Sequence, residues 1–225
     1  MLNAMKPKGR DTRQRIIEAA DALFYGEGVR AAGVDKIAEK AGLTKRTLYY
    51  HFSSKDELIA AYLEGRHGPT MCRYRSWFDQ SSGTLDQRIV GIFAEVAKLA
   101  SDPKWKGCGF ARAAAELAGL PGHPAIAIAS RHKHEFERWF TQLLVEDSVA
   151  DSQSLAKQLM VLLDGAVTQI MIHRDPEYAL VAGRAAATLI GVAARVPSVS
   201  GLSKARTRMP TTDGRFSGEA SRQVS

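Results

Sequence analysis

The sequence predicts an all-α protein with a small N-terminal unit of three helices and a larger helical body. Apolar residues recur at intervals of three and four along most of the 225 residues, which is the spacing of one helix face. No stretch alternates apolar and polar residues between hairpin turns, as a half-buried β-strand would. The chain is long enough to bury a substantial core in one or two domains.

The predicted helices follow the apolar spacing and the glycine and proline breaks. The first helix covers about residues 10–26, and two short helices follow it. A fourth helix begins near Lys55, and Pro69 could break or kink it because proline lacks the backbone N–H that a helix interior needs. In the body we expect five further helices, at about 85–99, 110–118, 125–144, 154–173 and 176–196.

The segment from Val34 to Phe52 predicts a helix-turn-helix. Apolar residues at helical spacing indicate a first helix that ends at about Ala41. Gly42 ends this helix, because glycine accepts the left-handed conformation that a helix C-terminus often needs. Thr44 can cap the next helix by accepting hydrogen bonds from its free backbone N–H groups. Two helices joined in this way form the unit that enters the major groove of DNA.

The second helix of this motif presents a basic and aromatic face. On a helical wheel Lys45, Arg46, Tyr49 and Tyr50 share one arc, while Leu48 points inward. Cations can neutralise phosphates or donate to guanine edges, and tyrosine can bond phosphate or pack on thymine methyls. A solvated basic helix is the alternative, and the capping pattern favours DNA. The predicted DNA-binding residues are Thr44, Lys45, Arg46, Thr47, Tyr49, Tyr50, His51, Lys55 and Gly33.

Residues Thr12 to Leu63 resemble the N-terminal domain of the TetR family of transcriptional regulators. The likeness is carried by VDKIAEKAGLTKRTLYYHF and by the following K-x-x-L from Lys55 to Leu58. It implies a DNA-binding head on a helical body that binds a small-molecule effector and dimerises. It further implies a repressor of a palindromic operator, released when effector binding moves the fourth helix and changes the spacing of the two heads.

The chain departs from the family pattern just before the second helix. Family members often carry a threonine there, which caps the helix and contacts phosphate. Ala31, Ala32 and Gly33 occupy this position, so that side-chain phosphate contact is lost. Gly33 can still cap the helix, because glycine is a tolerated N-cap residue. We therefore expect the phosphate contacts to come mainly from the second helix of the motif, the recognition helix, and from Lys55.

Composition and the resemblance together divide the chain into four parts. We expect a flexible basic arm at 1–9, the helix-turn-helix DNA-binding domain at 10–66, the effector-binding and dimerisation body at 67–196, and a disordered basic tail at 197–225. The net charge is +3 in residues 1–66, +1 in the body and +3 in the tail, within an overall +7. The basic excess thus lies on the predicted DNA-binding domain and on the tail, as expected of a DNA-binding head on a regulatory body.

The last two predicted helices, about 154–173 and 176–196, predict a homodimer. The second of them carries Gly183, Gly191 and several alanines, and small residues let helices approach closely. Two such helices per chain can form a four-helix bundle across a two-fold axis. Internal core packing is the alternative, and the family resemblance favours the dimer. Paired heads about one helical turn apart would read a palindrome in double-stranded DNA.

The effector is predicted to bind among the middle helices of the body, although the sequence does not identify the compound. Aromatic residues there are more often plain core than pocket wall. Arg112 and Glu116 stand four residues apart and could simply pair with each other. The predicted lining is Phe78, Phe93, Cys108, Arg112, Glu116, Trp139, Met171 and His173, with Trp77, Trp105, Phe110, Phe140 and His123 as further candidates.

Other function classes receive little support from the sequence. It contains no nucleophile elbow, no phosphate-binding glycine loop and no HExxH motif, so no enzyme is predicted. A Cys108–His123 nucleophile pair is the remaining enzymatic alternative. A third class is a helical ligand-binding protein that has lost DNA binding, and the basic helix argues against it. No cysteine–histidine grouping has zinc spacing, so we predict no metal and no cofactor.

The sequence also predicts a cytoplasmic protein without a membrane partner. No apolar run approaches the roughly 18 to 20 residues of a transmembrane helix. The basic N-terminus lacks the apolar stretch of a secretory signal. Two cysteines, Cys72 and Cys108, are too few for a disulfide framework, which favours reduced thiols.

Overall fold

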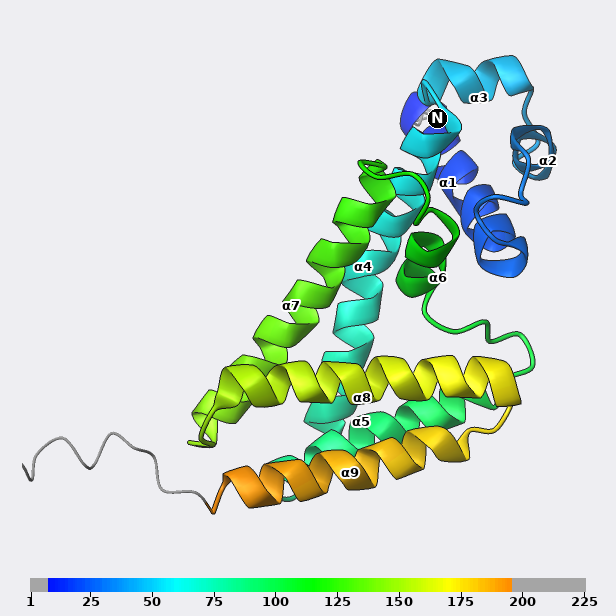
Figure 1. Ribbon diagram of the computed structural model, residues 1–225. Coiled ribbons are helices and arrows are strands. Elements are labelled where there is room, and N and C mark those ends of the chain that lie inside the picture. The colour runs from blue at the N-terminus through cyan, green and yellow to red at the C-terminus, as the bar shows by residue number, and fades with distance from the viewer. Residues whose placement is uncertain (1–7, 196–225) are drawn as a thin grey trace, which may run out of the picture.

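The computed structural model describes residues 8–195, which form nine α-helices and no β-strand. The predicted all-α class is therefore confirmed for this part of the chain. In Figure 1 the N-terminal helices lie at one end of the molecule, the helices of residues 85–100, 152–173 and 177–193 lie at the other, and those of residues 55–80 and 124–146 run between them. The elements are α1 (Lys8–Glu27), α2 (Val34–Lys40), α3 (Lys45–His51), α4 (Lys55–Gln80), α5 (Leu85–Ala100), α6 (Gly109–Glu116), α7 (Pro124–Glu146), α8 (Ser152–His173) and α9 (Glu177–Ala193).

Each predicted helix is present, with ends that differ by a few residues. The largest difference is at α9, which ends at Ala193 and not at 196. The predicted arm 1–9 and tail 197–225 lie outside the described residues, except that Lys8 and Gly9 begin α1. Cap geometry explains several ends: Ser54 accepts from the backbone N–H of Glu57 at the start of α4, and the ring of His123 accepts from the backbone N–H of Ala125 at the start of α7.

α4 is one continuous helix of 26 residues that crosses the expected domain boundary between residues 66 and 67. Pro69 lies inside it and does not end it. Because proline offers no N–H, the carbonyl of Gly65 lacks its usual partner four residues on. The helix therefore joins the two ends of the molecule through one locally weakened turn.

Two hydrophobic cores lie at the two ends of α4. The first collects buried residues of α1 to α4, including Ile16, Leu48 and Phe52, and takes Phe110 from α6 and Ile128 from α7. The second is built from α5, α7, α8 and α9 with the C-terminal half of α4. A division of the chain at residue 66 therefore does not separate the cores, because α6 and the first turns of α7 complete the core of the N-terminal helices.

Helix α8 is long and apolar enough to cross a membrane by length and composition alone. Its most apolar window has a mean hydropathy of 1.4 although polar residues interrupt it, and 44% of this window is buried inside the molecule. The helix packs against α7 and α9, and Leu155, Leu159 and Leu163 belong to the second core. Core helices of soluble proteins pass the same test of length and composition, and the packing of α8 accounts for the buried part of its apolar surface.

Candidate nucleic-acid interface and body cavity

The turn between α2 and α3 has the geometry expected of a glycine-terminated helix. Gly42 has φ +65°, which is the left-handed conformation, and its N–H donates to the carbonyl of Glu39 at 2.9 Å. The N–H of Leu43 donates to the carbonyl of Ala38 at 2.9 Å. The guanidinium of Arg15 on α1 donates to the carbonyl of Ala41 at 2.6 Å. These bonds fix the angle at which α3 leaves the turn.

Capping residues set the start of each helix in the motif. Gly33 is the N-cap of α2 with φ −79° and ψ 148°, and it offers no side chain to the helix. Thr44 is the N-cap of α3: its Oγ1 accepts from the backbone N–H of Thr47 at 3.1 Å, and the two hydroxyls lie 2.9 Å apart. Both predicted caps therefore stand where the sequence places them.

The outer face of α3 is polar and aromatic, while Leu48 on its inner face is fully buried. Tyr50 is 85% exposed and Tyr49 is 43% exposed, so both rings can reach a ligand. Arg46 is exposed and forms no ion pair among residues 12–195, whose side chains the structure describes. His51 is half-buried, with its ring edge-on to Tyr50 at 5.3 Å between centroids. The face combines one unpaired cation with two accessible aromatic rings.

Lys45 is already paired on the protein surface. Its Nζ lies 3.0 Å from the carboxylate of Asp35 on α2, and this hydrogen bond raises the pKa of Lys45. Exposed ion pairs of this kind contribute little to stability because water and salt screen them. A phosphate could therefore replace Asp35 as the partner of Lys45 at small cost.

Lys55, at the start of α4, is half-buried and less accessible than the exposed side chains of α3. Its Nζ donates to the carbonyl of Arg30 at 3.0 Å, and burial lowers the pKa of this amine. The bond ties the start of α4 to the loop between α1 and α2. The predicted phosphate contact of Lys55 would have to compete with this bond.

The body contains a cavity of about 270 Å³ between α4, α5, α7 and α8, roofed by the segment that leads into α6. Tyr74, Trp105, Phe110 and Phe136 give it an aromatic lining. Of the eight residues predicted to line the effector site, Cys108 does so. Trp105 and Phe110 from the further candidates also line it.

The other seven predicted lining residues lie elsewhere. Phe78 and Trp139 pack edge-on in the second core, Phe93 packs under Gly183, Met171 packs under Gly107, and the ring of His173 stacks on Tyr178. Arg112 donates to the carbonyl of Tyr25 at 2.6 Å, and Glu116 accepts from the backbone N–H of Arg30 at 2.9 Å. Arg112 and Glu116 therefore bind α6 to the N-terminal helices and do not pair with each other.

Several residues that line the cavity were not predicted from the sequence, because the residues that they contact lie on helices far away in the chain. Lys133 on α7 pairs with Asp164 on α8 at the cavity wall. Burial opposes the charge of Lys133, but Cys108 and Asp164 outweigh it and raise the pKa of this amine. Burial raises the pKa of Tyr74 on α4 and lowers the pKa of His132 on α7 to about 3. No local spacing in the sequence marks α4, α7 and α8 as neighbours.

No cluster of three or more His, Cys, Asp or Glu side chains suited to a metal ion occurs within residues 12–195. The two cysteines are free thiols, Cys72 exposed and Cys108 half-buried. The cavity therefore offers aromatic rings, hydrogen-bonding groups and paired charges to a ligand.

Comparison with known proteins gives consistent matches. Residues 16–62 match the model of bacterial regulatory proteins of the tetR family. The regulator TtgR of Pseudomonas putida is 42% identical over 67 residues, which cover 30% of this chain and 32% of TtgR. The repressor KstR2 of Mycobacterium tuberculosis is 37% identical over 81 residues, covering 36% of this chain and 40% of KstR2. The chain thus matches about a third of the length of these curated relatives.

A solved structure extends the likeness to the body. A TetR transcriptional regulator from Streptomyces avermitilis is 30% identical and superposes with a TM-score of 0.71. The match covers 81% of this chain and 97% of that structure. It includes the helical body as well as the helix-turn-helix. The motif, the fold and these matches together show that the chain belongs to the TetR family of bacterial regulators.

Proposed function

We propose that this protein is a sequence-specific DNA-binding repressor that acts in the cytoplasm as a homodimer and leaves its palindromic operator when a small molecule binds. The outer face of α3 is the observation that carries the DNA-binding part. A capped helix, anchored by buried Leu48, presents Arg46 without an ion-pair partner in the described chain, beside exposed Tyr49 and Tyr50. This combination suits a helix that lies in the major groove.

The proposed dimer is supported by uncovered apolar side chains on α8 and α9. Val161 and Ile172 on α8 and Val181 and Val192 on α9 are exposed. Both helices lie at the end of the molecule away from α3, as Figure 1 shows. A four-helix bundle across a two-fold axis would bury these side chains and leave both α3 helices free.

The proposed release mechanism runs through α4. This helix lines the cavity with Arg66, Thr70 and Tyr74, and its first turns belong to the core of the N-terminal helices. A ligand that moves α4 would shift the α3 helix of each protomer. Two recognition helices whose spacing changes can no longer occupy successive major grooves.

The proposal assigns no enzymatic reaction. Cys108 lines the cavity, whereas His123 caps α7 and has its Nε2 3.3 Å from Asp56 on α4. The structure thus gives these two residues separate surroundings, and family members are transcription regulators.

Selection of binding sites from random double-stranded DNA with purified protein tests this function. We expect an enriched palindrome with half-sites about one helical turn apart. Arg46→Ala should weaken the enrichment, while Arg75→Ala, at an exposed arginine of α4 outside the α3 face, should leave it unchanged. Absence of any enriched sequence would overturn the proposal.

A further inference from the structure

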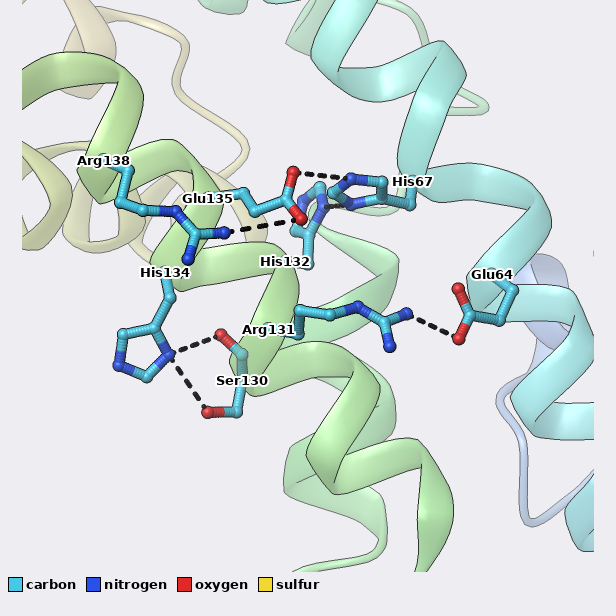
Figure 2. A network of polar contacts seen from close by, with 8 residues as sticks. All are labelled: Glu64, His67, Ser130, Arg131, His132, His134, Glu135 and Arg138. Atoms are coloured by element: carbon cyan, nitrogen blue, oxygen red, sulfur yellow. Dashed lines mark hydrogen bonds and ion pairs between the residues drawn. The ribbon is translucent and has the colours of Figure 1, made fainter. Parts of the chain in front are cut away.

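A chain of three side chains connects α4 to α7 at the cavity wall. Figure 2 shows His67 of α4 placed between His132 and Glu135 of α7. The Nδ1 atoms of the two histidines are 2.9 Å apart, and Nε2 of His67 lies 3.1 Å from the carboxylate of Glu135. Two hydrogen bonds thus converge on one imidazole of the helix that carries the N-terminal unit.

The carboxylate at the end of this chain fixes the positions of the protons. A carboxylate only accepts, so Nε2 of His67 donates to Glu135. When His67 carries only this proton, its lone pair lies at Nδ1, and Nδ1 accepts from His132. His132 is neutral because burial lowers its pKa to about 3. Its single proton therefore lies on Nδ1, and its Nε2 is a hydrogen-bond acceptor.

The acceptor nitrogen of His132 belongs to a ring that lines the cavity. The ring is held face to face on Phe110, with centroids 3.6 Å apart and planes 9° apart. Nδ1 is used by His67, and Nε2 makes no hydrogen bond among the described residues. An unpaired acceptor on a ring that lines the cavity favours a ligand that brings a donor to it.

The charged groups around the cavity are largely neutralised already. Lys133 pairs with Asp164, and Arg66 lies 2.7 Å from the carboxylate of Asp21. Arg73 and Lys104 also line the cavity, but both are exposed to solvent. An anion placed deep in the cavity would lose its hydration without finding a free buried cation. The charge pattern therefore favours an uncharged ligand.

We propose that the cavity binds an uncharged aromatic compound of one or two rings whose hydroxyl or N–H group donates to Nε2 of His132. Tyr74, Trp105 and Phe136 supply the aromatic walls, and the volume of about 270 Å³ suits a compound of that size. His67 and Glu135 are positioning residues, because they hold His132 in its acceptor form. This inference rests on the proposed effector site and names the ligand class for it.

Calorimetric titration of the full chain without DNA tests the ligand class. The probes are 2-naphthol, 2-methylnaphthalene, which replaces the hydroxyl by a methyl group, and 2-naphthoate. We expect 2-naphthol to bind and 2-naphthoate to bind at least ten-fold more weakly. If 2-naphthol fails to bind, or 2-naphthoate binds as tightly, the proposal is wrong. Operator selection uses no ligand, so failure here leaves the DNA-binding proposal separately testable.

A second comparison assigns the hydrogen bond to His132. His132→Phe keeps a ring on Phe110 and removes the acceptor, so the affinity ratio of 2-naphthol to 2-methylnaphthalene should fall about five-fold or more. His134→Gln is the control, because His134 is exposed and bonds the carbonyl of Ser130 within its own turn (Figure 2). An unchanged ratio in His132→Phe overturns the assignment.

The positioning role of Glu135 has its own readout. Glu135→Gln can donate to His67 as well as accept, which frees His132 to carry its proton on Nε2. The preference for 2-naphthol should fall, and the affinity for 2-acetonaphthone, which can only accept, should rise. Loss of both affinities together would show a merely structural role and contradict the positioning role.

Arg138→Gln is the control for Glu135→Gln. It removes a side chain 3.5 Å from the same carboxylate and should leave both affinities unchanged. If His132→Phe does not fold, Glu135→Gln carries the test.

Discussion

Arg46 is the cation of α3 that is available to a base edge. It is exposed and forms no ion pair among the described residues, so no existing contact has to be broken. If Arg46 donates to guanine, Arg46→Ala should lose about 1–3 kcal/mol of discrimination at one position of each half-site. Fluorescence anisotropy against operators with single base changes measures this loss. An equal loss of affinity for every sequence would contradict base reading.

Lys55 differs from Arg46 because it also stabilises the fold. Its ammonium donates to the carbonyl of Arg30 and is partly buried there. Lys55→Ala should therefore lower the free energy of unfolding by about 1 kcal/mol in urea denaturation, whereas Arg46→Ala should change it by less than about 0.5 kcal/mol. An unchanged unfolding free energy in Lys55→Ala would show that the bond to Arg30 does not contribute.

The DNA contact of Lys55 is a separate prediction. If its ammonium leaves Arg30 for a phosphate, Lys55→Ala should weaken binding to all sequences alike and reduce the salt slope of the binding constant by about one unit. Titrations at several salt concentrations measure the slope. A slope equal to that of the parent chain would place Lys55 in the fold alone.

His132 makes stability depend on pH below neutrality. Burial lowers its pKa from 6.5 to about 3, so the unfolded chain binds this proton more tightly than the folded chain does. The contribution of His132 is full above pH 6.5 and falls as the pH drops toward 3. Between pH 7.5 and 5.5 the loss amounts to about 1.4 kcal/mol.

Urea denaturation at both pH values checks this contribution. His132→Phe should lose about 1.4 kcal/mol less between them than the parent chain does. His134→Gln should keep the full dependence, because His134 is exposed. Identical pH dependence in His132→Phe would mean that the imidazole of His132 has the same pKa in the folded chain as in the unfolded chain.

Between elements, the approach of α9 to α5 depends on Gly183. A Cβ at this position would stand 2.9 Å from Cβ of Phe93, closer than two carbons can pack. Gly183→Ala should therefore cost about 1–3 kcal/mol through overpacking. Gly26→Ala in α1 is the matched control, because nothing lies within 4 Å of the added carbon, and it should gain about 0.5–1 kcal/mol. Urea unfolding of both variants tests this, and equal changes would contradict the close packing.

Between elements, the sequence predicts those features that depend on residues close together in the chain. The helix-turn-helix depends on Gly42 and Thr44, whose conformational and capping preferences act on residues a few positions away, so their effect is visible in the sequence. The cavity depends on contacts between α4, α7 and α8, which no local spacing encodes. Phe93 and Trp139 were predicted to line the effector site and instead lie in the second core, because an apolar pattern does not tell a core residue from one beside a void. Arg112 and Glu116 find partners more than 80 positions away.

For the whole molecule, α4 connects two hydrophobic cores that no single cut in the chain would separate. The core of the N-terminal helices includes residues of α6 and α7, and both α4 and α7 continue into the second core. The ion pair between Arg131 of α7 and Glu64 of α4, and the contact of His123 with Asp56, add polar links between these two helices. Motion of α4 alone is therefore resisted by α7, and a ligand between them acts on both.

The predicted dimer links the two ends of the molecule, because contacts through α8 and α9 would set the positions of the two α3 helices. Val161 is 72% exposed and Ile172 is 65% exposed on α8, and a dimer through α8 and α9 would bury both. Sedimentation should then give about twice the chain mass of 24.5 kDa at micromolar concentration. Val161→Glu with Ile172→Glu should give the monomer, because two buried, unpaired carboxylates per chain cost more than the interface can supply.

That monomeric variant should bind a palindrome only as weakly as a single half-site, because the second head no longer adds to the first. Its unfolding should stay cooperative, since both substituted side chains are exposed in the single chain. Leu120→Glu, at an exposed apolar residue before α7 and outside the proposed interface, should remain dimeric and bind normally. A double variant that stays dimeric would place the interface elsewhere. A parent chain that sediments as a monomer yet binds the palindrome tightly would separate operator recognition from dimerisation in free solution.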